Sequence, residues 1–506
     1  MTETAPPAAS AFTVHAPGTG KPLADHPVHG PREVDAAVDR ARSAATRWAA
    51  LSAAGRKGRL TLWRRSLAAH LDRMAETIAA ETGKPVGDAQ LEVVLTLEHL
   101  AWASRNAGPL LRRRGVGTGL LASNQRATVV HRPLGVIGVI GPWNYPLYTP
   151  MGSIGYALSA GNGVVFKPSE LTPGTGVLLA ELFDEAVPEY AGLLTVVTGA
   201  AGTGDALARS GVDKLAFTGS PGTARKVMEV CARSLKPFLA ECGGKDATIV
   251  TADADLDAAA DAVVWGAMSN AGQTCAGVER VYAVREVHAA LCEKVVERVR
   301  ALPTGPGADS AYGPMTLPGQ TEVVRRHVEE ALAAGARALF GGSESLPTAG
   351  EERTVGEFVG PVVLADVPED ASAMREETFG PTVAINAVAD VDEAVRRAND
   401  SSYALGATVF CGNGRTGAEI AARLRAGAVS VNSVLGFAAV PGLPFGGSGD
   451  SGFGRIHGAQ GLLAFTAPQS VTVQRFAPPV NLTSFTAPLA ARARAVAMAR
   501  WMHRRR

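Results

Sequence analysis

Short apolar runs alternate with stretches of helical pattern from residue 136 onward, and this alternation constrains the fold more than any other feature of the sequence. The strand-like runs of the first series are Val136–Ile140, Gly163–Phe166, Leu194–Val197 and Leu215–Phe217. The helical stretches between them are Gly152–Ser159, Gly174–Glu185 and Thr203–Arg209. Apolar strands joined by helices are typical of βαβ units, so the pattern predicts a parallel sheet covered by helices.

A second series of the same kind runs from Ala247 to about Pro441. It contains a helix and the strand-like runs Thr248–Val250, Arg280–Ala283, Val383–Ile385, Thr408–Phe410 and Val429–Val431, the helix being Val287–Ala301. With 506 residues the chain is long enough for two or three domains. We therefore expect an α/β protein with more than one domain.

The parts outside these two series have other patterns. Residues 34–114 are helical in pattern, with long Ala/Leu/Arg runs, whereas residues 1–30 are rich in Ala, Pro, Gly and His and are expected to form a loose arm. Thr128–Arg132 alternates weakly and ends at Pro133, which suits an edge strand or a hairpin arm.

Charge and cysteine content exclude several classes of protein. The chain has 49 Lys+Arg and 48 Asp+Glu, a net charge of +1, so it lacks the basic excess of proteins that bind nucleic acid. Its five cysteines are odd in number and scattered, which predicts neither a disulfide framework nor a metal site. Unpaired thiols and the absence of a secretory pattern in the first 30 residues indicate the cytoplasm.

Two segments bear on membrane contact. The stretch between Arg132 and Lys167 has no charged residue, but prolines at positions 133, 142, 146 and 150 would break a spanning helix, so we expect buried strand, loop and helix there. The chain after Ser451 has no Asp or Glu and ends in an arginine-rich tail. A solvated tail and weak contact with a membrane surface are both open for it.

Three local motifs carry candidate chemistry, each with an ordinary alternative. Cys275 follows Gly272-Gln273-Thr274 and is either a nucleophile or, as more often for a lone cysteine, a buried structural thiol. Glu241 ends an apolar run before two glycines, which suits a general base with a raised pKa or a salt-bridge partner. Asn144 lies between two prolines, where its amide could donate to a developing oxyanion or simply stabilise a turn.

In combination and in order, these motifs resemble the NAD(P)-dependent aldehyde dehydrogenase superfamily over nearly the whole chain. The segments that carry the resemblance are Gly141–Pro146, Lys167–Glu170, Phe217–Ser220, Glu241 with Gly243–Lys245, Gly272–Cys275, Glu376–Pro381 and Pro444–Gly447. The resemblance implies two Rossmann-type α/β domains and a small β arm that joins subunits into a homodimer or homotetramer.

The resemblance also implies roles for matching residues. Cys275 would attack a small-molecule aldehyde, Asn144 and the Cys275 backbone N–H would hold the oxyanion, and Glu241 would activate the water that hydrolyses the thioester; no metal is implied. The implied cofactor is NAD, because the Glu170 carboxylate would repel a 2′-phosphate, with NADP as the alternative because Lys167 could offset that repulsion. The cofactor-binding residues it implies are Ile140, Trp143, Lys167, Glu170, Gly219, Ser220, Glu377 and Phe379.

Two residues depart from the common pattern of the superfamily. Cys242 stands where many relatives have Leu, and Ser153 stands where many hydrolytic members have a Lys that helps to position the general base. Ser153 and the ending from Gly449 to Thr466 resemble the class-three and fatty-aldehyde branch, whose members favour aromatic and medium- to long-chain aldehydes. We therefore expect an apolar substrate, with Tyr148, Leu435 and Phe437 as candidate pocket residues or, equally, as core residues.

Other functions stay open at this point. A CoA-acylating enzyme has no need of Glu241 as a base, and a semialdehyde dehydrogenase, for example for succinate semialdehyde, would need a cation for the substrate carboxylate. A cysteine hydrolase needs a histidine near Cys275, and no motif brings one there; His288 lies on a helical pattern.

The resemblance divides the chain into seven segments. They are 1–114 for the N-terminal arm and the helical part of the nucleotide-binding domain, 115–134 for the first part of the oligomerisation arm, 135–244 for the NAD-binding domain, 245–443 for the catalytic domain, 444–465 for a return to the nucleotide-binding domain, 466–478 for the second part of the arm, and 479–506 for the basic tail.

Overall fold

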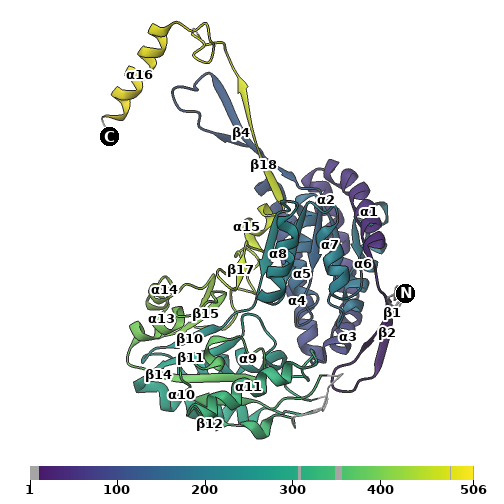
Figure 1. The fold of residues 1–506 in the computed structure, drawn as a ribbon, viewed down its shortest axis with the longest axis vertical. Helices are drawn as coiled ribbons and strands as arrows, with labels where there is room; N and C mark the ends of the chain where they lie inside the picture. Colours follow the sequence, from purple (N-terminus) through teal and green to yellow (C-terminus); the bar gives the residue numbers. More distant parts are fainter. Residues whose placement is uncertain (1–10, 306–308, 348–355, 479, 505–506) are drawn as a thin grey trace, which may run out of the picture. The chain divides into compact units, whose positions relative to one another are not determined.

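The chain forms two compact units in the computed structural model, which describes residues 11–305, 309–347, 356–478 and 480–504 (Figure 1). Unit 1 comprises Met1–Leu110 and Pro133–Thr466, and unit 2 comprises Leu111–Arg132 and Ala467–Arg506. Both α/β series lie in unit 1. The seven-segment division of the chain, with its boundaries, stays a prediction.

A six-stranded sheet forms the first half of unit 1, in the order β17-β9-β8-β5-β6-β7. Its strands are β5 (Val136–Ile140), β6 (Gly163–Lys167), β7 (Leu194–Val196), β8 (Lys214–Thr218), β9 (Phe238–Glu241) and β17 (Gly452–Phe453). All neighbours are parallel except β17, which is antiparallel to β9. The chain starts at the central β5, builds outward to β7, and then crosses back to β8, so strand order reverses between β5 and β8. Ligands of open parallel sheets bind at the carboxyl ends of strands at such a reversal.

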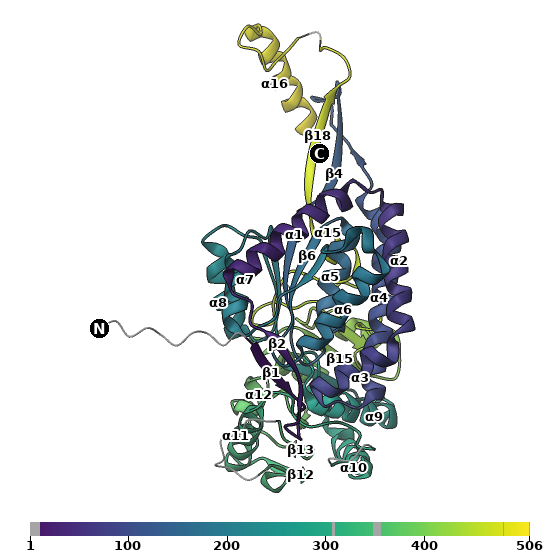
Figure 2. The ribbon, with the colours of Figure 1, turned by 90° about the vertical axis from the view of Figure 1, so that its right-hand side faces the viewer.

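Helices cover both faces of this sheet (Figure 2). One face is packed by α1 (Pro31–Ala50), α7 (Ala201–Arg209) and α8 (Pro221–Ala232), and the other by α5 (Tyr148–Ala160) and α6 (Pro173–Ala186). The helices α2 (Ala53–Ala69) and α3 (Leu71–Thr82) pack against α6, and the long α4 (Val86–Leu111) follows them. Because both faces are covered, every residue of β5 and β6 is buried, as in other parallel sheets.

A seven-stranded sheet forms the second half of unit 1, in the order β12-β13-β14-β11-β10-β15-β16. Its strands are β10 (Asp246–Val250), β11 (Val278–Val284), β12 (Arg337–Phe340), β13 (Val362–Ala365), β14 (Thr382–Val388), β15 (Gly406–Phe410) and β16 (Ala428–Val431). Only the edge strand β12 runs antiparallel to its neighbour. The accompanying helices are α9 (Leu256–Met268), α10 (Arg285–Ala301), α11 (Gln320–Ala333), α12 (Ser372–Arg375), α13 (Val391–Asn399) and α14 (Gly414–Ala421). The short helix α15 (Gly458–Leu463) belongs to the first half, where it packs on α5.

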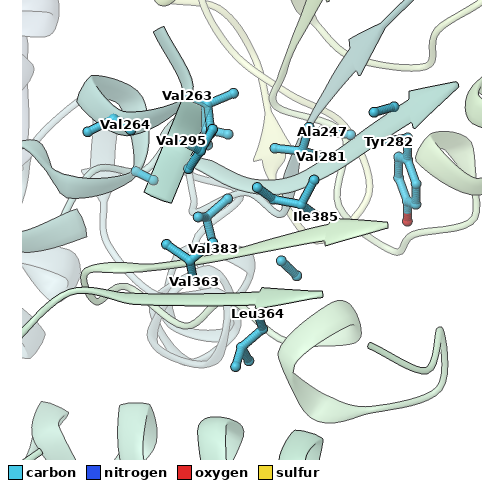
Figure 3. Close-up of a cluster of buried hydrophobic side chains, with 14 of the residues drawn as sticks. Ala247, Val263, Val264, Val281, Tyr282, Val295, Val363, Leu364, Val383 and Ile385 are labelled. Carbon is cyan, nitrogen blue, oxygen red and sulfur yellow. The ribbon is translucent and has the colours of Figure 1, made fainter. Parts of the chain in front are cut away.

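The core of this second half lies between its sheet and the helices α9 and α10. Figure 3 shows Val263 on α9 and Val295 on α10 beside strands that carry Val281, Val363 and Ile385. All five side chains are fully buried. The predicted α/β fold with parallel sheets is therefore confirmed, and both sheets are present.

The N-terminal end of the chain differs from what the sequence predicts. Within the expected loose arm of residues 1–30, Ala11–His15 (β1) and Pro22–Pro27 (β2) form an antiparallel hairpin, and residues 1–10 lie outside the described part. Unit 2 contains the three-stranded sheet β18-β4-β3, built from β3 (Arg114–Val116), β4 (Gln125–Pro133) and β18 (Thr466–Gln474). The basic tail forms a helix, α16 (Leu489–His503), none of whose residues is buried. None of the helices in the described ranges has the length and apolar character needed to cross a bilayer.

The helix α2 offers a matched pair of leucines to test this packing. Leu67 is 0% exposed and Leu62 is 47% exposed on the same helix. We expect Leu67→Ala to lower the free energy of unfolding by about 2–5 kcal/mol, because it removes buried methyl groups and leaves a cavity. Leu62→Ala should change it by less than about 0.5 kcal/mol. Urea unfolding followed by circular dichroism measures both, and equal losses would contradict the burial of Leu67.

Candidate active site

A cavity of about 290 Å³ in unit 1 has both Cys275 and Glu241 in its wall. Helices α4, α5 and α9, the carboxyl end of β9, and the loops around residues 434–439 and 445–457 contribute the rest of the lining. Most of these side chains are apolar, among them Leu91, Leu95, Trp265, Val434, Phe445 and Ile456. The two residues that the sequence singled out as nucleophile and base therefore face one mainly apolar chamber.

Cys275 is presented by a tight segment that follows α9. Asn270, Ala271 and Gly272 all have left-handed backbone conformations, with φ values of 53°, 56° and 71°. A side chain at Gly272 would collide with the backbone carbonyl of Gly380, so glycine is needed there. Non-glycine residues rarely adopt this conformation, and a run of it is typical of functional sites.

Asn144 reaches the cysteine segment through a backbone contact. Its side-chain Nδ2 donates to the carbonyl oxygen of Gln273, 2.9 Å away. An amide nitrogen carries two N–H donors, and among the described residues only Gln273 accepts from this one. The second N–H therefore has no acceptor among the described residues, and Asn144 itself is not among the residues that line the cavity.

The loop that carries Asn144 is fixed by a buried ion pair that sequence reasoning missed. Lys84 Nζ lies 2.9 Å from Glu92 Oε2, and both side chains are almost completely buried. Lys84 also donates to the Asn144 carbonyl oxygen at 2.7 Å. Glu92 Oε1 accepts from the backbone N–H groups of Leu147 and Tyr148 at 2.9 and 3.0 Å. One charged pair thus forms hydrogen bonds with backbone groups at both ends of the Asn144 loop. Sequence reasoning missed the pair because neither Lys84 nor Glu92 lies in a segment with a recognisable motif.

Glu241 ends β9 and has no partner for its carboxylate. The side chain is 3% exposed, and neither carboxylate oxygen has a hydrogen-bond partner among the described residues. Burial raises its pKa well above the ordinary value, and the nearby charge of Arg455 opposes that rise only in part. A buried carboxyl with a raised pKa and no partner is suited to accept a proton from a bound molecule.

The Cys275 thiol lies in an electrostatic setting that keeps it protonated. Burial raises its pKa, and the carboxylates of Glu377, Asp246 and Glu241 raise it further. Asp246 and Glu377 have raised pKa values themselves, about 7 and about 8, chiefly because they are buried. The thiol therefore needs a base to become a nucleophile.

Glu377 and Phe379 lie on a loop anchored by a second buried ion pair. Lys245 Nζ contacts Glu279 Oε2, and Glu279 accepts from the backbone N–H groups of Thr378 and Phe379. Glu377 Oε1 accepts from the Gly244 N–H at 3.1 Å and covers Gly243 so closely that a side chain there would collide with it. The Phe379 ring makes an edge contact with Trp143, with ring centroids 5.5 Å apart.

The other expected cofactor residues lie at the carboxyl ends of the first sheet. Ile140 ends β5 and Lys167 ends β6, and both approach Gly204 on α7. Lys167 Nζ donates to the Pro168 carbonyl oxygen at 2.6 Å and lies 3.5 Å from Glu170, which is 48% exposed. Gly219 follows β8, and Ser220 caps α8 by accepting from the Thr223 N–H.

The three expected substrate residues lie in different places. Tyr148 and Leu435 line the cavity, whereas Phe437 is not among the lining residues and packs behind it with Ala276 and Leu405. The lining also includes His457, a buried residue that sequence reasoning did not place near Cys275. Neither ring nitrogen of His457 has a hydrogen-bond partner among the described residues, so no hydrogen bond joins it to Cys275. The Gly-Arg-Ile-His-Gly segment gave no signal for the place of His457 in the lining, because that place depends on contacts between distant segments.

Comparison with known proteins gives one family. The model of the aldehyde dehydrogenase family matches residues 4–471. The 4,4'-diapolycopene aldehyde oxidase of Methylomonas sp is 38% identical over 462 residues, which are 91% of this chain and 85% of that protein. A Mycobacterium ulcerans protein named putative succinate-semialdehyde dehydrogenase (NADP+) 2 is 38% identical over 460 residues, 90% of this chain and 87% of that one.

A solved structure agrees with these relatives. The crystal structure of the NAD-dependent aldehyde dehydrogenase from Sinorhizobium meliloti superimposes with a TM-score of 0.87 at 33% identity, covering 94% of this chain and 93% of that chain. The chain has two mainly parallel sheets, and a cysteine and a carboxylate line one chamber. These features agree with the similarities to known proteins. The chain belongs to the aldehyde dehydrogenase family.

Proposed function

We propose that this enzyme oxidises apolar aliphatic or aromatic aldehydes to carboxylic acids, with Cys275 as nucleophile and Glu241 as general base. The observation that carries the proposal is the shared chamber of these two side chains, with its mainly apolar lining. The residues needed to add sulfur to a carbonyl and later to activate water are both present in it.

The first step is addition of Cys275 to the aldehyde. The Sγ–C bond forms, the C=O π bond opens, and the thiol proton passes to a carboxylate that has no other partner, Glu241. The new oxyanion accepts from the free Nδ2–H of Asn144 and from the Cys275 backbone N–H. Loss of one such donor typically costs about 100- to 1,000-fold in rate. A nicotinamide cofactor held by Glu377 and Phe379 would supply the acceptor for the hydride of the former aldehyde carbon.

The second step hydrolyses the thioester left on Cys275. Glu241, after it has released its first proton to solvent, takes a proton from water as the water oxygen bonds to the thioester carbon. The tetrahedral oxyanion collapses, the C–S bond breaks, and the carboxylic acid leaves. Ser153, which stands where many hydrolytic members have a lysine, is buried and carries no charge. The pKa of Glu241 is raised by burial and lowered in part by the charge of Arg455.

The carboxyl edge of the six-stranded sheet fits a dinucleotide. Lys167 is buried and has only a carbonyl oxygen and the Glu170 carboxylate as partners, so its ammonium can donate to a further oxygen. Gly202 in the first turn of α7 and Gly222 in the first turn of α8 have open space where a side chain would be, which allows close approach to those helix ends. Lys167, Glu170, Ser220, Glu377 and Phe379 would hold the cofactor.

NAD is the cofactor we propose, with NADP as the alternative. The half-exposed Glu170 carboxylate can accept from the two hydroxyls of a ribose and would repel a 2′-phosphate. Lys167 lies 3.5 Å away and offsets part of that repulsion. The names of the relatives cover both cofactors, since one similar structure is NAD-dependent and the Mycobacterium ulcerans relative is named for NADP+.

The cavity lining favours an apolar substrate over a semialdehyde with a carboxylate. No arginine is among the residues that line it, and the one lining lysine, Lys84, is paired with Glu92. The lining also carries Asp88 and Glu241, which would repel a second carboxylate. The relative from Methylomonas is named for a polyene aldehyde, and others are named for succinate semialdehyde.

A panel of aldehydes tests this proposal. We expect octanal, decanal and benzaldehyde to be oxidised without CoA, with kcat/KM at least tenfold above that of succinate semialdehyde, because a carboxylate buried without a partner is costly. NADH or NADPH absorbance at 340 nm measures each reaction with NAD and with NADP. Activity that requires CoA, or a preference for succinate semialdehyde, would overturn the proposal.

Substitution of Glu241 tests its place in the second step. Glu241→Gln should leave a burst of NADH equal to about one turnover per site but slow its rate, because the thiol loses the carboxylate that accepts its proton. Steady turnover should fall further, by about 100-fold or more, because hydrolysis of the thioester loses its base. Cys275→Ser should abolish both phases and serves as the control. Stopped-flow absorbance resolves the burst, and an unchanged steady rate would remove Glu241 from the mechanism.

Unit 2 supports a proposal about assembly and location. It contains twelve arginines and no acidic residue, so with a net charge of +1 for the whole chain the rest of the molecule carries −11. Its exposed apolar side chains include Leu120, Leu121, Phe476 and Phe485. We infer that this basic and apolar surface is covered by the acidic body of another copy, giving a homodimer or homotetramer.

All five cysteines are free thiols, which fits the cytoplasm.

Charge reversal in unit 2 tests the assembly. We expect a dimeric or tetrameric mass by light scattering in low salt, and at least tenfold weaker association when Arg112, Arg113 and Arg126 are changed to Glu. Arg285→Glu on the exposed start of α10 is the control. A monomeric mass for the unchanged protein would contradict the proposal. Binding of the protein to anionic vesicles that disappears when residues 480–506 are removed would instead favour membrane-surface contact by the tail.

A further inference from the structure

Three side chains that line the substrate cavity have buried polar atoms without a partner among the described residues, Glu241, Ser269 and His457. Of these, His457 has both of its polar atoms, the two ring nitrogens, in an otherwise aromatic setting. It is 1% exposed, lines the cavity, and neither Nδ1 nor Nε2 has a hydrogen-bond partner among the described residues. A buried polar group that lacks a partner costs free energy, so such a group in a native structure calls for a ligand or water. Glu241, also without a partner, is absorbed by the proposed mechanism; His457 is not.

The surroundings of His457 hold its ring in place by aromatic contact alone. Its centroid lies 4.1 Å from the ring of His99, 5.6 Å from Tyr148, 5.7 Å from Tyr156 and 6.0 Å from Phe445. The tyrosine hydroxyls donate elsewhere, to the carbonyl oxygens of Ala438 and Pro441. His99 Nδ1 also has no partner among the described residues, and no neighbouring side chain satisfies the ring nitrogens of His457.

The main chain and the helix α5 fix the position of the His457 ring. His457 has a left-handed backbone with φ 59°. Its Nε2 packs against Gly152 of α5, where a Cβ would be only 2.6 Å away, so Nδ1 is the ring nitrogen left for a ligand. Gly152 is one helical turn after Tyr148, which also lines the cavity. A larger residue at position 152 would displace the imidazole, so the position of the His457 ring depends on the glycine at position 152.

The chemistry of the ring selects the ligand. Burial and the neighbouring His99 lower the pKa of His457, so the ring is neutral and offers one N–H donor and one acceptor nitrogen. A hydroxyl group can bond the nitrogen that faces it in either tautomer, accepting from an N–H or donating to a bare nitrogen. A carboxylate can only accept, and it would add a further negative charge to a chamber that already holds Glu241 and Asp88.

We propose that His457 is a specificity residue that binds a hydroxyl group of the substrate, so that the preferred substrates are apolar aldehydes bearing one hydroxyl. The inference rests on the proposed aldehyde oxidation at Cys275 and names its substrate class more narrowly. The aldehyde carbon lies at Cys275, the apolar body of the substrate lies against Leu435, Phe445 and Ile456, and the hydroxyl lies at the imidazole.

Matched pairs of aldehydes test this assignment. Benzaldehyde is compared with its 2-, 3- and 4-hydroxy derivatives, and octanal with hydroxyoctanals, by kcat/KM from NADH formation. We expect at least one hydroxylated partner in the wild-type enzyme to exceed its parent by about tenfold or more. His457→Phe, which keeps a ring of similar size and removes both nitrogens, should reduce that ratio to near one.

Two further variants and one equilibrium measurement complete the experiment. His457→Gln, which keeps a donor and an acceptor, should retain part of the preference, and His288→Phe on α10 should retain all of it. Inhibition constants of the corresponding hydroxy acids and parent acids should show the same preference, and they report binding even if a variant is slow. A ratio that is the same in wild type and His457→Phe would overturn the inference and leave only water at His457. Failure of every aldehyde would instead overturn the proposed function itself.

Discussion

The buried ion pair between Lys84 and Glu92 is the interaction on which the site depends. One carboxylate accepts from two backbone N–H groups at the start of α5, and one ammonium donates to the Asn144 carbonyl oxygen. The ammonium also lies 4.1 Å from the centre of the Tyr145 ring. Burial of two charges contributes little net stability, but removal of one partner leaves the other charge buried and typically costs about 3–5 kcal/mol. The pair therefore specifies a single loop conformation, and with it the positions of the Asn144 amide and the Tyr148 wall.

The same principle recurs in the second half of unit 1. Lys245 directly precedes β10 and Glu279 lies near the start of β11, and Glu279 accepts from the backbone of the loop that carries Phe379. Parallel strands bring their carboxyl ends to one edge, which collects Ile140, Lys167, Thr218 and Glu241 on one sheet. Loops leaving such an edge have no ladder to satisfy their backbone, and buried carboxylates supply the missing acceptors. The predicted site residues lie at the ends of these strands, and the buried ion pairs fix the loops that carry them.

Much of the fold followed from sequence pattern, and the exceptions have physical causes. The strand Val136–Ile140 was predicted residue for residue, because a short apolar run between Pro133 and Gly141 leaves little freedom. The hairpin formed by Ala11–His15 and Pro22–Pro27 was missed, because its mostly exposed strands show no clear alternation. Lys84, Glu92 and His457 act through contacts between distant segments, which no local pattern reveals. Phe437 could not be placed from sequence, because its neighbours Ala276 and Leu405 lie far away along the chain.

The carboxylates around Cys275 have a consequence for the enzyme at rest. Glu377, Asp246 and Glu241 raise the pKa of the thiol, so in the absence of substrate the sulfur stays protonated. The thiolate, and not the neutral thiol, is the form that attacks a peroxide. A thiol that these carboxyl groups keep protonated is therefore less open to oxidation than an exposed thiolate would be.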